Sequence, residues 1–146
     1  MKYLAVLIVL SGTSHIDEPL DWPIYMITTA LGFAALENAL FLIKPLSIDA
    51  GIVSLLTGQL RFLGATLLHS IASGIIGISI GLSLHLNGWK MKLCPFIGLV
   101  VAIALHSAFN FFIIRDNGND FLKVFAFLWV VTIIVILLFE KVRRIN

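Results

Sequence analysis

The sequence predicts an all-α fold: a polytopic membrane helix bundle with four full transmembrane helices and a truncated N-terminal helix. Two observations support this prediction. Hydrophobic residues make up 60% of the 146 residues, charged residues only 12%, and the mean hydropathy is +1.05, whereas soluble domains are about 45–50% apolar and about 25% charged. The apolar residues also form runs of the roughly 20 residues that a helix needs to cross a bilayer. We expect one membrane domain over residues 1–146.

Four runs have the length of a spanning helix: residues 23–43, 62–86, 93–114 and 121–139. A fifth run, residues 3–10, is too short to span alone. It is similar either to the apolar core of a secretory signal peptide or to the last turns of a helix that begins upstream. We favour the truncated helix, because the run is at the short limit for a signal peptide.

Residues 44–61 connect the first two runs. The apolar positions Ile48, Ile52, Leu55 and Leu56 favour a short amphipathic helix at the membrane interface, and an irregular surface loop is an equal alternative. Within the run that follows, small residues recur at a spacing of four, as Ser70 with Gly74 and Gly77 with Gly81. Such spacing lets helix backbones approach closely in lipid and predicts tight packing.

Composition narrows the classes of partner and site. The net charge of +2 is small and the charged residues are scattered along the chain, so we expect no nucleic-acid partner. The partners that we expect are the lipid bilayer and other molecules of the membrane. Cys94 is the single cysteine, which excludes an internal disulfide and any metal site built from several cysteines.

Ionisable residues inside the runs are few: Glu37, which Asn38 follows, His69, and His106, which Asn110 follows four residues later. A charged side chain at the centre of a membrane helix costs about 2.5–3.5 kcal/mol. Taken singly, a histidine is more often a packing residue, and an asparagine commonly bonds a neighbouring helix. A carboxylate such as Glu37 has no comparable partner in hydrocarbon.

The depth of these residues links them. We call side A the membrane face at which residues 43, 62 and 114 lie, and side B the opposite face. At a rise of 1.5 Å per residue, Glu37 lies roughly 10 Å, His69 about 12 Å and His106 about 13 Å from the side A ends of their runs. Residues that only pack within their own helices would have no reason to lie at the same depth, so we expect the three side chains to converge.

Helix faces support one shared pocket. Phe33 and Glu37 are four residues apart, as are His106 and Asn110, so each pair lies on one face. A carboxylate with two imidazoles could activate water for hydrolysis. The same three groups could instead bind a divalent metal such as zinc as a His₂Glu set. The residues alone leave both alternatives open.

Three motifs add a resemblance. "GFAALEN" (residues 32–38), "RFLGATLLH" (61–69) and "HSAFN" (106–110) resemble, in order and spacing, motifs of the PrsW family of intramembrane proteases. This family is related to the CAAX-processing and bacteriocin-immunity proteases. The resemblance covers nearly everything from residue 2 to residue 114.

The resemblance implies an intramembrane endopeptidase that cleaves membrane-anchored regulatory proteins, such as anti-sigma factors, near the membrane surface. It implies an integral, multi-pass protein of a prokaryotic cell membrane. The catalytic residues it indicates are Glu37, His69, His106 and Asn110, and the supporting ones are Phe33, Asn38, Arg61 and Lys2. Because it points to a glutamate-centred mechanism, we expect no cofactor, with zinc held by the glutamate and both histidines as the alternative.

One family motif, EExxK, is incomplete. Lys2 aligns with its lysine, so both glutamates would precede Met1 and are absent from the sequence as written. We therefore expect this chain to show little or no peptidase activity on its own. Met1 would then be an internal methionine of a longer protein, or the chain a fragment or a pseudoenzyme. Since the other three motifs are intact, we favour a missing N-terminal portion.

Two non-catalytic functions compete. One is a membrane scaffold that retains substrate binding only, and the other is a proton or ion pathway, since Glu and His chains also act as relays. A pathway needs polar residues in both halves of the bilayer, and the side B halves of the runs are almost purely apolar. Orientation stays open, because lysines and arginines are equally numerous on the two sides.

Overall fold

The computed structural model describes residues 18–43, 52–115 and 121–145, with side chains placed for residues 18–40, 62–112 and 122–144. The described residues form helices and no strand, which confirms the all-α prediction. The helices are α2 (Asp21–Ile43), α3 (Ile52–Ser83), α4 (Trp89–Arg115) and α5 (Phe121–Ile145). The predicted truncated helix, residues 3–10, lies outside the described residues.

Three of these helices contain a stretch long and apolar enough to cross a membrane: Phe62–Ser83, Trp89–Phe112 and Leu122–Arg144. The helix α2 follows the first predicted run but is not among them. The prediction of four full spans is thus supported for three helices of the described part of the chain.

The start of α3 differs from the prediction. A separate interfacial helix or loop was expected up to residue 61, but the helix is continuous from Ile52 to Ser83. No proline interrupts this stretch, so the chain keeps its helical hydrogen bonds instead of breaking them. Residues 44–51, with Ile48, lie outside the described residues.

The end of α3 comes at Ser83, three residues earlier than predicted. The backbone N–H groups of Leu84, His85 and Leu86 bond carbonyls three residues back, which tightens the last turn. Gly88 then takes a φ of +65°, a left-handed conformation that glycine adopts without strain. This turn sends α4 back alongside α3.

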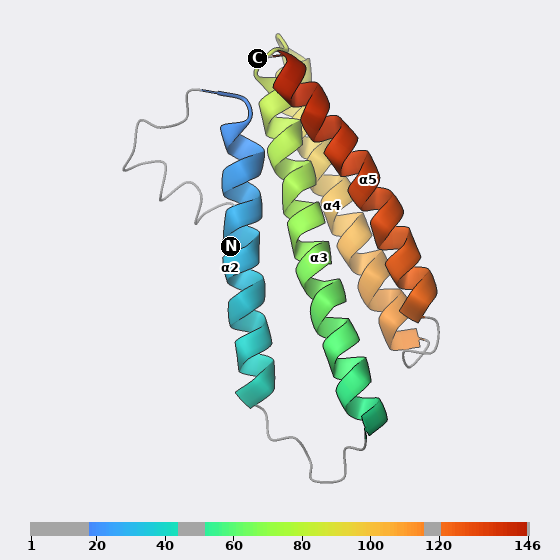
Figure 1. The fold of residues 1–146 in the computed structure, drawn as a ribbon. Coiled ribbons are helices and arrows are strands. Elements are labelled where there is room, and N and C mark those ends of the chain that lie inside the picture. The colour runs from blue at the N-terminus through green and yellow to red at the C-terminus, as the bar shows by residue number, and fades with distance from the viewer. Residues whose placement is uncertain (1–17, 44–51, 116–120, 146) are drawn as a thin grey trace.

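The helix α3 is central and contacts each of the other three (Figure 1). Its small residues allow this. A Cβ on Gly77 would collide with the backbone of Pro23 in α2, and one on Gly81 would meet the carbonyl oxygen of Pro19. On α4, Gly98 packs in the same way against Ser79 of α3. The predicted tight packing of the small residues is confirmed.

The buried core follows α3 and faces α4 and α5. Its members are Leu68, Ile71, Ile78, Leu105, Phe109, Leu128, Val135 and Val142. The outer faces of α4 and α5 remain apolar and exposed, as in Ile103, Ile133 and Leu137. Apolar outer faces of this extent are expected of helices that contact lipid rather than water.

Gly77→Ala should lower the free energy of unfolding by about 1–3 kcal/mol, because the new Cβ meets backbone that no rotamer change can move. Gly32→Ala is the matched control: nothing lies within 4 Å of its Cβ position, and alanine favours a helix interior by up to about 1 kcal/mol. Unfolding of the purified protein in detergent by increasing SDS would measure both. Equal stability of the two variants would contradict the close contact.

Candidate active site

His69 joins residues from two other helices. Its Nε2 lies 2.6 Å from Oε2 of Glu37 on α2, and its ring centroid lies 5.3 Å from that of His106 on α4, with the ring planes tilted by 36°. Both contacts agree with the convergence that the matched depths predict. The structure therefore brings the three residues together around α3, with His69 in the middle.

Burial differs across this cluster. The side chain of His69 is 8% exposed and that of Glu37 is 53% exposed. The imidazole is thus held inside the bundle, while the carboxylate lies where a second molecule can reach it. When Glu37 is ionised, the Nε2–H of His69 donates to it, and when Glu37 is protonated its O–H donates to Nε2.

Phe33 also packs against the His69 ring. The two ring centroids are 5.4 Å apart and the planes meet at 81°, an edge-to-face contact. Phe33 and Glu37 are one helical turn apart on α2, so both reach the same imidazole. The predicted common face of these two residues is confirmed by their shared contact with His69.

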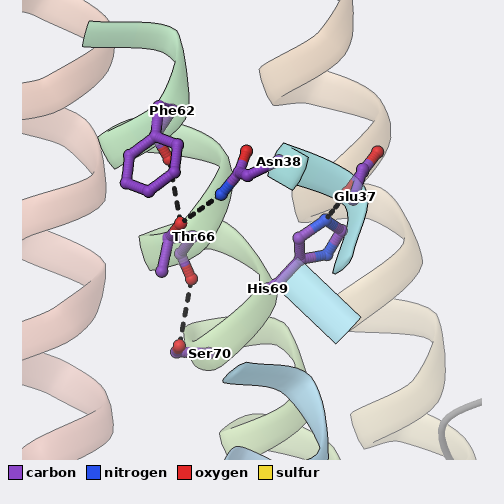
Figure 2. A network of polar contacts seen from close by, with 6 residues as sticks. All are labelled: Glu37, Asn38, Phe62, Thr66, His69 and Ser70. Atoms are coloured by element: carbon purple, nitrogen blue, oxygen red, sulfur yellow. Dashed lines mark hydrogen bonds and ion pairs between the residues drawn. The ribbon is translucent and has the colours of Figure 1, made fainter. Parts of the chain in front are cut away.

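A second polar contact joins α2 to α3 beside the first. Nδ2 of Asn38 donates to Oγ1 of Thr66 at 3.1 Å, and that hydroxyl donates to the carbonyl oxygen of Phe62 at 2.9 Å (Figure 2). Successive residues of α2 therefore bond α3 at two points, Glu37 at His69 and Asn38 at Thr66. This arrangement restricts the rotation of α2 about its axis.

Thr66 was not predicted from the sequence. A signal was present, because Thr66 precedes His69 by three residues and so lies near it on the surface of α3. Threonine also commonly bonds across helices in membranes. Its location opposite Asn38 depends on how α2 packs against α3, which helical periodicity does not specify.

The remaining predicted residues are not brought into this cluster by the described contacts. Asn110 is exposed and forms no hydrogen bond with a described residue, so its support of His106 stays a prediction. The side chain of Arg61 and the whole of Lys2 lie outside the described part of the chain.

Two imidazoles and a carboxylate are suitable zinc ligands, but their arrangement does not match such a site. Among residues with placed side chains, no three His, Cys, Asp or Glu groups are positioned to hold one metal ion. The Nε2 atom of His69 is directed at Glu37. The described residues alone thus do not fit a metal centre. They do form a carboxylate–imidazole pair, which can position a water and accept its proton.

The double variant Asn38→Ala/Thr66→Val should show a coupling energy of about 0.6 kcal/mol, and at most about 1.7 kcal/mol, the range for hydrogen bonds between membrane helices. SDS unfolding of the wild type, both single variants and the double variant measures it. Thr132→Val is the matched control, because the Thr132 hydroxyl bonds only Leu128 of its own helix, and its combination with Asn38→Ala should be additive. Additivity of the first pair would contradict the contact.

Comparison with protein-family models identifies the family of the chain. No curated protein and no solved structure shows a significant match to the chain. The family model described as PrsW family intramembrane metalloprotease matches residues 1–139. This range includes Glu37, His69 and His106 and nearly the whole chain of 146 residues. The chain therefore belongs to the PrsW family of intramembrane metalloproteases.

Proposed function

We propose that this chain forms the membrane domain of an intramembrane endopeptidase that hydrolyses peptide bonds of membrane-anchored proteins near side A. The observation that carries this proposal is the bond between Glu37 and His69. It joins a half-exposed carboxylate to a buried imidazole, at a depth of roughly 10 Å by helical rise. Membership of an intramembrane protease family supports the same activity.

In this proposal Glu37 is the general base. Its carboxylate takes a proton from a water whose oxygen attacks the carbonyl carbon of the substrate. When the C–N bond breaks, the same proton passes to the leaving amine, so Glu37 returns to its ionised form. His69 holds the carboxylate in position through Nε2, and His106 supplies an N–H donor to the oxygen that becomes negative.

The position of α2 supports access to the site. We propose that α2 is a fourth membrane helix, whose polar residues Glu37 and Asn38 bond α3. Across this interface the Glu37 carboxylate meets His69, and the Asn38 amide meets Thr66. A substrate segment that unwinds beside α2 would present its backbone to Glu37, which is the exposed member of the pair.

We propose membrane-anchored regulatory proteins, such as anti-sigma factors, as substrates, and a prokaryotic cell membrane as the location. Both proposals rest on the family resemblance. A proton pathway is disfavoured because the side B part of the bundle, between α3, α4 and α5, is lined almost entirely by apolar side chains. A scaffold without activity is the outcome that a negative cleavage assay would support.

Glu37→Gln should lower the rate of cleavage by about 10²- to 10⁴-fold, the contribution of a general base. The assay uses the full-length protein in proteoliposomes with a single-span model substrate, labelled on both sides of the side A membrane boundary. Glu140→Gln is the matched control: Glu140 bonds Arg143 and Arg144 on α5, away from α2. A Glu37→Gln variant with full activity would rule out the proposed base, and an inactive wild type would support the scaffold.

We expect cleavage to survive strong chelation, because Nε2 of His69 is bonded to Glu37 and no third ligand joins the pair among the placed side chains. Elemental analysis of the full-length protein, with cleavage measured before and after chelation, provides the test. Stoichiometric zinc whose removal stops cleavage, and whose return restores it, would overturn this expectation and establish the metal dependence named in the family description.

A further inference from the structure

A cavity lies in the half of the bundle opposite Glu37. Its volume is about 660 Å³, and it is bounded by α3, α4 and α5. Ile78 and Leu82 of α3 line its floor, Ile97 of α4 one wall, and Ile134 and Leu138 of α5 the other. The groove exists because α4 and α5 contact each other much less than each contacts α3.

The groove has the length of one lipid leaflet. Its lining on α4 runs from Trp89 to Val101, a separation of twelve residue steps, which is about 18 Å at a rise of 1.5 Å per residue. The hydrocarbon core of a bilayer is about 30 Å thick, so one leaflet spans about 15 Å. Trp89 marks the outer end, where tryptophan commonly lies at the membrane interface.

Positive charge lies at the same outer end. Lys90 is exposed, lines the groove and forms no ion pair with a described residue. On α5, Lys141 follows Ile134 and Leu138 on the helix face that lines the groove, and it too has no carboxylate partner among the described residues. Each lysine thus has an ammonium group available to an anion.

The neighbouring arginines differ from these lysines. Glu140 bonds Arg143 at 2.9 Å and Arg144 at 3.0 Å. The acidic group at this end of α5 is therefore engaged by the arginines and does not neutralise Lys141. An incoming anion would compete with no described carboxylate for Lys90 or Lys141.

We propose that this groove binds one acyl chain of an anionic phospholipid, whose phosphate is held by Lys90 and Lys141. The apolar lining accommodates the chain along one leaflet, and the two lysines complement the headgroup charge. The site lies on other helix faces than the Glu37–His69 pair, so it does not depend on the proposed protease mechanism.

A transmembrane peptide helix is a poorer occupant. It would have to continue through the second leaflet, where the groove ends. An acyl chain is thinner and ends at the bilayer centre.

Cys94 makes the proposal testable without a cleavage assay. It lines the groove, is partly exposed, and is the only cysteine of the chain. The rate of its alkylation by N-ethylmaleimide would be measured on the full chain in detergent, with increasing dipalmitoyl phosphatidylglycerol. We expect the lipid to slow alkylation, and neither inorganic phosphate nor a 20-residue Leu/Ala peptide to do so.

Lys90→Gln should raise the phosphatidylglycerol concentration needed for half protection by roughly fivefold, the effect of one lysine near an anionic lipid surface. Lys92→Gln is the matched control, because Lys92 is exposed on the same turn of α4 but does not line the groove. Protection by the peptide at lower concentration than the lipid would overturn the proposal in favour of a protein partner. No protection by the lipid, or equal protection in both variants, would also overturn it.

Discussion

The close approach of α2 and α4 to the glycine and serine positions of α3 is the constraint on which the rest of the structure depends. Gly77 lies against the backbone of Pro23, and Ser79 lies against Gly98. Without water to drive helix association in lipid, such contacts supply packing that larger side chains would prevent. They bring three helices near enough for short polar side chains to meet across them.

The polar cluster depends on this packing. Glu37 and Asn38 are consecutive on α2 and bond different residues of α3, His69 and Thr66. Two bonds of this kind fix both the distance and the rotation of α2. No buried side-chain nitrogen or oxygen among the described residues lacks a hydrogen-bond partner, as is usual for the interior of a folded protein.

The two ends of the bundle have different chemistry. Toward side A, α2 completes a polar cluster beside α3. Toward side B, the sparse contact between α4 and α5 leaves an apolar groove with Lys90 at its mouth. A small membrane domain can therefore hold a carboxylate–imidazole pair and a surface suited to a lipid chain without mixing them, because different helix pairs form each one.

Composition and periodicity determined the helices and the residues of interest, because a run of some 20 apolar residues and a rare carboxylate within such a run are local properties. The common depth of Glu37, His69 and His106 also followed from helical rise alone. Tertiary structure decided which atoms meet. The bond from Asn38 to Thr66 and the exposed location of Asn110 both depend on the rotation and spacing of packed helices. The groove between α4 and α5 depends on the same geometry, since neither helix alone encloses a cavity.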